Sequence, residues 1–153
     1  MEDIKLKAKD IPGGYALCFN SDCEKKDSCL HYLTQQLVGD EYNKGQAVYP
    51  KAWQSGKCHC YNEKKLVQKA WGFSQLYRNV PSYLRAQARR SVSALFGNGN
   101  GQYYRAHHGQ IMISPKRQEE IKEVLKQFGN NDVKFDHYVT VWDFDWHTAY
   151  QPL

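Results

Sequence analysis

The spacing of its cysteines constrains this chain more than any other feature. Three of the five cysteines, Cys18, Cys23 and Cys29, fall within twelve residues of a polar and charged stretch, and Cys58 and Cys60 follow later. Free cysteine is usually buried among apolar side chains, which a stretch of this composition does not supply. Thiols from two distant segments are typical of a soft-metal or cluster site. The sequence therefore predicts a metal centre that joins two separate parts of the N-terminal half.

Zinc is the metal that these cysteines favour. Four thiols would complete a tetrahedral shell, from Cys18, Cys23, Cys29 and Cys58. Three close cysteines and one remote cysteine also suit an iron–sulfur cluster, which stays as the alternative cofactor. Cys60 or His59 could replace Cys58 as the fourth ligand, because a Cys-x-Cys step in an extended segment lets only one side chain point easily at a single ion. Burial of the thiols in an ordinary core is the competing interpretation without a metal.

The length of 153 residues suits one domain with a substantial hydrophobic core. We expect a single domain, 1–153, with a Cys-rich part at 1–63, a basic part at 64–118, and a helix and a strand at 119–153. A run of eighteen apolar residues and a secretory leader are both absent from the sequence, so we expect a cytoplasmic protein with no membrane attachment. In that reducing compartment an odd number of cysteines argues against a disulfide framework.

Positive charge is concentrated in one block of the chain. The 55 residues from Lys64 to Gln118 contain ten Lys and Arg and no Asp or Glu, although the net charge of the whole chain is only +5. A surface of this kind attracts polyanions, because its cations neutralise phosphates and release their counterions. A basic face paired with the acidic C-terminal segment of the same fold is the competing interpretation. The block predicts a nucleic acid, DNA or RNA, as the partner.

Apolar spacing predicts helices over 29–38, 64–77, 82–96 and 115–128. The last of these has the clearest ends, because Ser114 can cap it, Pro115 suits its first position and Gly129 can stop it. Cys29 falls in the first turn of its helix, where the dipole favours a thiolate. We expect the α+β class: a Cys-rich N-terminal loop region, then about three to four helices packed on a small antiparallel sheet.

Short strands are expected at 4–9, where a frayed terminus is the alternative, and at 47–49, 102–105, 110–113 and 133–144. The third and fourth would form a hairpin, and two helices followed by a basic hairpin is the order of a winged helix-turn-helix in the middle of the chain. The residues predicted to contact nucleic acid come from helix 82–96, this hairpin and the start of the next helix. They are Arg85, Arg89, Arg90, Tyr103, Tyr104, Arg105, His107, Lys116 and Arg117.

Two weaker motifs have simpler explanations. The loop Gly97–Gly101 alternates Gly and Asn and could cradle a phosphate, but it lacks the Gly-Lys-Ser/Thr ending of a P-loop, so a flexible connection is the better interpretation. Asp143, Asp145 and His147 would share one face of a strand and could hold a hard cation. Acids at the end of a strand beside the basic block are the simpler account, because three ligands without a nucleophile make no catalytic site.

Several short motifs together resemble a known family over nearly the whole chain. They are Tyr15–Cys23, Cys29, Ala70–Phe73, Phe96–Gly99, Tyr103–Arg105 and Phe135–Tyr138. The chain resembles a family of small uncharacterised proteins from Bacteroides and related gut bacteria, and the cysteine motif is part of that family's pattern. The family has only a domain-of-unknown-function label. The resemblance implies a bacterial cytoplasmic origin and transfers no activity or catalytic residue.

The function that these features favour is a metal-stabilised, cytoplasmic nucleic-acid-binding protein with a regulatory role. The alternative is a protein–protein interaction adaptor without enzymatic activity, which would use exposed aromatic residues against its partner. An enzyme is the third choice, because the sequence shows no Ser-His-Asp order, paired carboxylates or phosphate loop. Binding that weakens steeply with added salt distinguishes the first function from the second.

Overall fold

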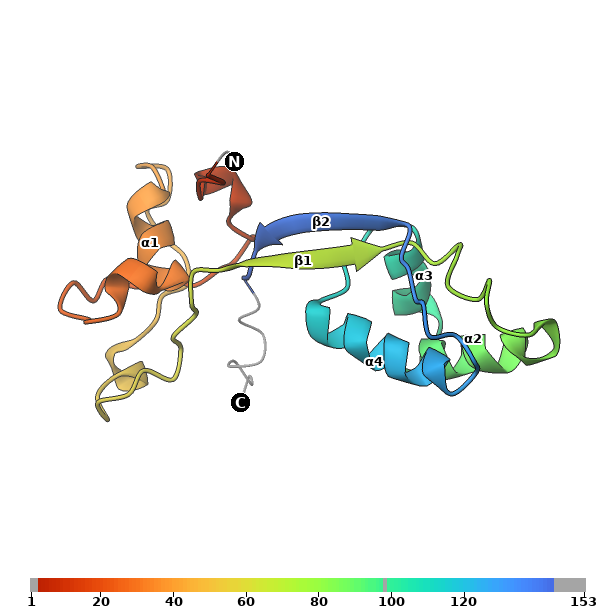
Figure 1. The fold of residues 1–153 in the computed structure, drawn as a ribbon. Helices are drawn as coiled ribbons and strands as arrows, with labels where there is room; N and C mark the ends of the chain where they lie inside the picture. The colour runs from red at the N-terminus through yellow and green to blue at the C-terminus, as the bar shows by residue number, and fades with distance from the viewer. Residues whose placement is uncertain (1–2, 98, 145–153) are drawn as a thin grey trace. The chain divides into compact units, whose positions relative to one another are not determined.

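The computed structural model describes residues 3–97 and 99–144. The chain divides into two compact units: unit 1 is formed by residues 1–66 and 142–153, and unit 2 by residues 67–141. The described residues form four α-helices and one two-stranded antiparallel sheet, so the expected α+β class is confirmed (Figure 1). None of the described helices is long and apolar enough to cross a bilayer. The single domain, 1–153, that was expected from the length stays a prediction.

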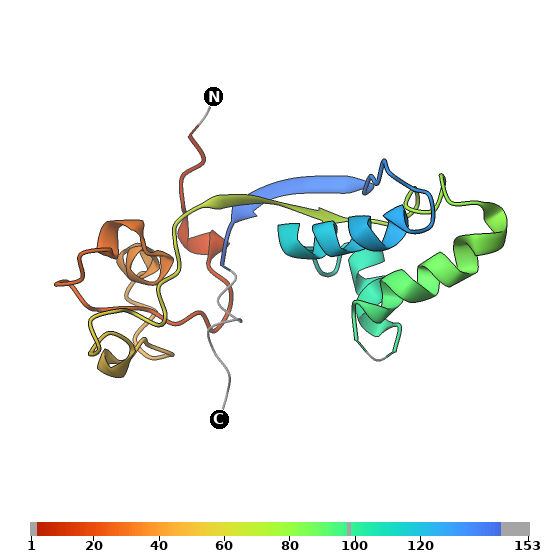
Figure 2. The ribbon, with the colours of Figure 1, turned by 60° about the horizontal axis from the view of Figure 1, so that its bottom comes forward.

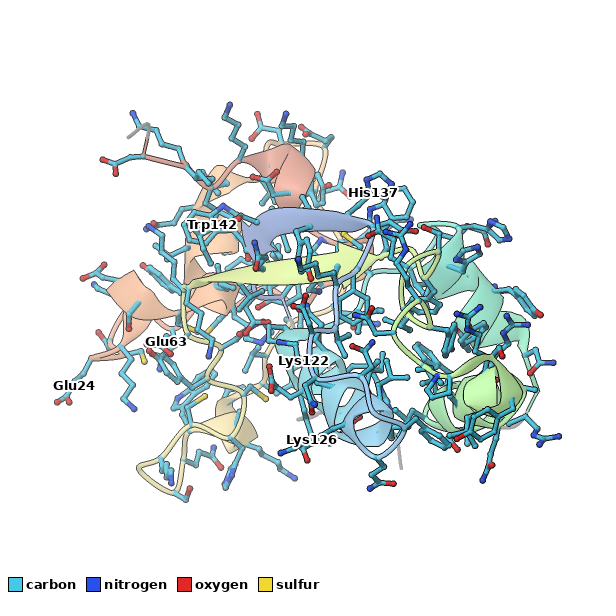
Figure 3. The ribbon with its side chains drawn as sticks, turned by 45° about the vertical axis from the view of Figure 1, so that its right-hand side comes forward. Glu24, Glu63, Lys122, Lys126, His137 and Trp142 are labelled. Carbon is cyan, nitrogen blue, oxygen red and sulfur yellow. The ribbon has the colours of Figure 1, made fainter. Side chains whose placement is uncertain are left out.

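Unit 2 contains three helices and most of the residues of the sheet. Its elements are β1 (Leu66–Trp71), α2 (Arg85–Ala94), α3 (Gly101–His107), α4 (Pro115–Lys126) and β2 (His137–Trp142). The three helices lie on the same side of the sheet (Figures 1 and 2), and α2 packs on α4. Thirteen buried residues form one core, to which α2 contributes Ala88 and Val92 and α4 contributes Ile121 and Leu125. Figure 3 marks the two ends of β2, His137 and Trp142.

Two of the predicted helices of unit 2 are confirmed. Ser114 caps α4, because its Oγ accepts a hydrogen bond from the Arg117 amide at 3.3 Å, and Pro115 takes the first position. Gly129 follows the helix with a φ of +90°, the left-handed conformation that favours glycine. The helix predicted at 82–96 begins as a 3₁₀ turn, Ser82–Leu84, and continues as α2.

The helix predicted at 64–77 is wrong. β1 occupies Leu66–Trp71, and the chain then turns at Gly72, which has a φ of +88°. A Cβ at Gly72 would lie only 2.6 Å from Cβ of Asp136, so the backbone of this turn passes very close to the segment that precedes β2. The spacing of apolar residues continues across this glycine and therefore resembles that of one long amphipathic helix. Pairing with a strand about 70 residues away overrode the local pattern.

The predicted hairpin is also wrong. Residues 102–105 belong to α3, in which Tyr103 and Ala106 are both buried, three residues apart as on one face of a helix. The segment 110–113 forms no strand and makes one antiparallel bridge between Ile113 and Ala70, with N–H···O distances of 2.8 and 3.1 Å. The described residues of unit 2 therefore lack the wing that a winged helix-turn-helix requires.

Unit 1 contains little regular structure in its described part. The helix expected at 29–38 is present as α1 (Leu30–Leu37), with Cys29 at the N-cap position. Of the two structures expected at 4–9 the strand is wrong, because the segment ends in a 3₁₀ turn, Ala8–Asp10, whereas 47–49 contributes one bridge between Ala47 and Leu17. The predicted strand 133–144 is shorter as β2. Tyr15, Leu30 and Phe144 form the small core of this unit.

Candidate functional site

All five cysteines border one cavity in unit 1, which we call the cysteine cavity. Its volume is about 30 Å³, room for a single ion or water molecule. The thiols of Cys18 and Cys29 are buried, and those of Cys23, Cys58 and Cys60 are partly exposed. Lys25 and Lys26 border the same cavity, whereas the adjacent Glu24 points outward from its loop (Figure 3).

Backbone hydrogen bonds bring the cysteine segments together. The Cys18 amide donates to the His31 carbonyl at 3.0 Å, which fixes the start of the cysteine stretch beside α1. Cys29 forms an antiparallel bridge with Glu63, flanked by two short bonds of 2.7 Å, from the Leu30 amide to the Asn62 carbonyl and from the Lys64 amide to the Ser28 carbonyl. The segment that follows Cys58 and Cys60 is thereby held against the N-terminus of α1. The main chain itself gathers the thiols.

The thiols also influence each other electrostatically. Burial raises the pKa of the Cys18 thiol, and so do the neighbouring thiols of Cys29, Cys58 and Cys23, although a backbone hydrogen bond at Asn20 lowers it. Burial raises the pKa of Cys60 in the same way, with contributions from Cys58 and Cys29. Within residues 3–97 and 99–144, no three His, Cys, Asp or Glu side chains are arranged to hold a metal ion. The cysteines are therefore gathered without forming a finished coordination shell.

His31 is a neighbour of the cysteine cavity that sequence reasoning missed. Its ring stacks on Tyr15 with a centroid distance of 4.4 Å, and its Nδ1 lies 2.6 Å from the Ala16 carbonyl oxygen. That geometry requires the proton on Nδ1, which leaves the lone pair on Nε2. Burial lowers the pKa of His31 despite this hydrogen bond. His31 follows Leu30 in the first turn of α1, outside the apolar stripe, and gave no signal in the sequence.

The second candidate site is a pocket of about 570 Å³ in unit 2, which we call the arginine pocket. It contains three arginines and no carboxylate among its lining residues. Arg78 comes from the turn before Pro81, Arg85 and Arg89 lie one turn apart on α2, and the rest of the wall comes from α3 and the turn after β1. The lining residues are Phe73, Ser74, Tyr77, Arg78, Arg85, Arg89, Tyr103, Tyr104 and His107.

The protein holds two of these arginines in place. Arg85 donates from Nε to the Val80 carbonyl at 3.0 Å and from a terminal nitrogen to the Arg78 carbonyl at 3.3 Å. The guanidinium carbon of Arg89 lies 5.5 Å from the ring centroid of Tyr77, within cation–π range. A guanidinium has five N–H donors, so both groups keep donors for a ligand. The pocket presents preorganised positive charge.

The aromatic residues of the arginine pocket divide into two kinds. Tyr103 is only 5% exposed, and its hydroxyl lies 2.8 Å from that of Tyr77, so it is part of the core. Burial raises the pKa of both phenols, which are therefore neutral at physiological pH. Tyr104 is 48% exposed and can stack with a ligand. His107 accepts a hydrogen bond at Nδ1 from the Phe73 amide at 3.0 Å, so its proton is on Nε2 in the neutral ring.

Not all the residues predicted to contact nucleic acid meet at this pocket. Arg85, Arg89, Tyr103, Tyr104 and His107 line it. Arg90, Arg105 and Lys116 are exposed outside it. Arg117 forms an ion pair with Glu120 at 2.9 Å, donates a hydrogen bond to the Leu95 carbonyl and lies over the ring of Phe96.

Sequence reasoning missed Arg78 and Ser74. Ser74 lies within the segment that was expected to be a helix, beside its apolar face, and Arg78 directly follows that segment. Their position inside the acid-free block was the one signal that could have identified them.

Asp136 fixes the wall of the arginine pocket. Its carboxylate accepts hydrogen bonds from the hydroxyl of Ser74 at 2.6 Å and from the amide of Ser74 at 3.0 Å. Burial acts to raise the pKa of Asp136, but these bonds and the neighbouring His107 and His137 outweigh it, and the pKa lies below its ordinary value. An ionised carboxylate therefore holds the turn that contains Phe73 and Ser74.

The two weaker motifs are described only in part. Asp143 lies 3.8 Å from the Nζ of Lys65, while Asp145 and His147 lie outside the described residues, so the cation site predicted from these three stays a prediction. Gly97 and Gly99 both have positive φ, as a flexible connection allows, and Asn98 between them lies outside the described residues.

Comparison with known proteins gives one match. Residues 1–146 match a protein family described as a family of unknown function, DUF6078. No curated protein and no solved structure matches the chain. The expected membership of a domain-of-unknown-function family is confirmed, and an origin in Bacteroides stays a prediction.

Proposed function

Because the chain belongs to the DUF6078 family, which assigns no activity, we propose from the arginine pocket that unit 2 binds nucleic acid. The observation that carries this proposal is the convergence of Arg78, Arg85 and Arg89 on a pocket of about 570 Å³ without a carboxylate. A guanidinium matches the geometry of a phosphate and binds it through two parallel hydrogen bonds. Three guanidinium groups in one pocket attract an anionic ligand.

The charge of unit 2 supports a polyanion as that ligand. Residues 67–141 contain eleven Lys and Arg and five Asp and Glu. Three of these acids are paired with neighbouring cations: Glu119 with Lys122, Glu120 with Arg117 and Asp132 with Lys134. Asp136 is bonded to Ser74. Four of the five acids are therefore engaged locally, and the arginines of the pocket and the exposed Arg90 and Arg105 remain for phosphates of a longer strand.

The shape of the pocket favours a single strand over a duplex. Duplex recognition needs an element that enters a groove, such as an exposed recognition helix or a wing. Unit 2 instead has a pocket whose lining includes the exposed ring of Tyr104. Proteins that bind single strands use this combination: cations along the backbone and an aromatic face on which a base stacks. We therefore place phosphates on the arginines and a base on Tyr104.

A pair of matched variants tests the proposal. Arg89→Gln removes a charge from the pocket, and Arg90→Gln removes the same charge from an exposed position next to it on the same helix. Binding of fluorescently labelled single-stranded DNA, single-stranded RNA and duplex DNA is measured by anisotropy at several salt concentrations. We expect single strands to bind more tightly than the duplex and log Kd to rise linearly with log salt.

The variants distinguish the pocket from general surface charge. Loss of a charged hydrogen bond to phosphate is expected to weaken binding roughly tenfold in Arg89→Gln, with a clearly smaller effect in Arg90→Gln. Equal losses in both variants would show that the pocket has no special role. No binding of any nucleic acid at low salt would refute the proposal and favour the protein-interaction adaptor, whose association is insensitive to salt.

A further inference from the structure

We propose that unit 1 is a zinc-binding module in which Cys18, Cys23, Cys29 and Cys58 hold one structural ion in the cysteine cavity. This inference goes beyond nucleic-acid binding, since every residue involved lies in unit 1 and none lines the arginine pocket. It rests on the convergence of the thiols, the small core of the unit, the positive charge beside the cavity and the size of the cavity.

The small core shows why unit 1 needs a cross-link. Among the described residues, three buried ones form its apolar cluster, compared with thirteen in unit 2, and the same part of unit 1 contains one α-helix of eight residues. Units below roughly 70–80 residues seldom stabilise themselves by a core of this kind, and they use disulfides or a structural metal. The five cysteines of unit 1 form no disulfide. Without disulfides, a bound metal ion is the other strong cross-link that these cysteine side chains can form.

The main chain provides the convergence that a metal requires. The cysteine stretch is bonded to α1 at Cys18, and the bridge between Cys29 and Glu63 brings the later cysteines to the same place. This pairing joins segments that lie more than thirty residues apart in the chain. The thiols do not yet form a shell, so binding requires rotation about the χ1 bonds of the cysteines, of which Cys23 and Cys58 are partly exposed and lie outside α-helices and strands.

Positive charge beside the cavity suits a site with four thiolates. When Zn²⁺ binds four cysteines, the thiols lose their protons and the site carries a net charge of −2. Lys25 and Lys26 border the cavity and can offset this charge. Both are positioned by other contacts: Lys25 Nζ lies 4.6 Å from the ring centroid of Tyr61, and Lys26 Nζ donates to the Ser21 carbonyl at 3.0 Å.

The size of the cavity favours zinc over an iron–sulfur cluster. A volume of about 30 Å³ accommodates one ion, with Zn–S distances of about 2.3 Å, once the sulfurs turn inward. A cluster of several irons and sulfides would need the surrounding loops to separate. Cys60 borders the same cavity, lies two residues after Cys58 and is partly exposed like Cys58. Cys60 therefore serves as a matched control.

The test measures zinc in the full-length protein. Wild-type protein and the variants Cys23→Ser, Cys58→Ser and Cys60→Ser are purified without chelators. Their metal content is determined by inductively coupled plasma mass spectrometry. We expect about one zinc per chain in the wild type and in Cys60→Ser, and a loss of more than tenfold in the other two. Wild-type protein without zinc, or brown protein with iron, would overturn the inference. Zinc that is lost from Cys60→Ser and kept in Cys58→Ser would overturn the ligand set.

A second measurement covers the case in which a variant does not fold. Hydrogen exchange of wild-type protein is compared before and after zinc is removed by a chelator. If zinc is structural, amides of residues 15–64 should exchange at least tenfold faster after removal, whereas those of α2 and α4 should keep their rates. Unchanged exchange in residues 15–64 would refute a structural ion in unit 1.

Discussion

Replacement of Gly72 by alanine tests whether the turn after β1 holds unit 2 together. Gly72 has a φ of +88°, its amide donates to the Ala106 carbonyl of α3 at 3.1 Å, and its carbonyl accepts from the Asp136 amide at 3.1 Å. An added Cβ would stand 2.6 Å from the Cβ of Asp136 and equally close to one of its carboxylate oxygens. Atoms near the main chain cannot move aside as the end of a long side chain can, so the substitution must displace one of the two segments.

The expected cost has two parts. Left-handed backbone costs a residue with a Cβ roughly 1–2 kcal/mol, and displacement of well-packed neighbours adds about 1–3 kcal/mol. Gly97→Ala supplies the matched control, because Gly97 has a φ of +92° and an added Cβ there would meet nothing within 4 Å. The first part is common to both variants. The difference between them, about 1–3 kcal/mol, is therefore the cost of the close approach to Asp136.

Urea unfolding followed by far-ultraviolet circular dichroism measures this difference, because α2, α3 and α4 supply most of the helical signal of the described residues. The unfolding midpoint of Gly72→Ala should fall below that of Gly97→Ala by roughly 1 M urea. Equal midpoints would show that the turn yields without cost and that Asp136 and Gly72 do not constrain each other.

Other substitutions test the hydrogen bonds and the core of unit 2. Tyr103→Phe leaves the buried Tyr77 hydroxyl without its partner, so it should lower the free energy of unfolding by about 1–3 kcal/mol, whereas Tyr104→Phe should change it little. Asp136 has a depressed pKa in the folded state, so its stabilisation is complete above the unfolded value near 3.8 and is lost as the pH falls through the lower folded value. Asp136→Asn should therefore be less stable at neutral pH and lose part of this acid dependence in denaturation curves at pH 2–7. Leu125→Ala should cost about 2–5 kcal/mol, because Leu125 is completely buried in the core; a smaller cost in calorimetry would mean that the core collapses around the gap.

The parts of the fold that sequence predicted correctly are those with local causes. The Ser114 cap, Pro115 and Gly129 define α4 within sixteen residues of sequence. The apolar spacing of Leu84, Ala88, Val92 and Leu95, all of which pack in the core, predicted α2. Arg85 and Arg89 were expected on one surface for the same local reason, and they line the arginine pocket together.

The parts that sequence predicted wrongly have partners far away in the chain. β1 pairs with β2 about 70 residues later, and no pattern within Leu66–Trp71 shows that pairing. The two tyrosines at 103 and 104 resembled a strand, but Tyr103 is held in a helix by contacts with Phe73 and Tyr77. Arg78 reaches the arginine pocket from the turn before Pro81. Its place in the pocket depends on tertiary structure and not on the spacing of residues in the sequence.

The two proposals can fail independently, and one experiment separates them. All nine residues that line the arginine pocket belong to unit 2, whose thirteen-residue core includes no residue of unit 1. Because that core lies wholly within unit 2, we expect the pocket to survive the loss of structure in unit 1. Full-length protein treated with a chelator should therefore bind single-stranded nucleic acid with a Kd within about twofold of the untreated protein, while the amides of residues 15–64 lose protection. A tenfold loss of affinity on chelation, reversed by added zinc, would show instead that unit 1 supplies part of the nucleic-acid surface or stabilises the pocket directly.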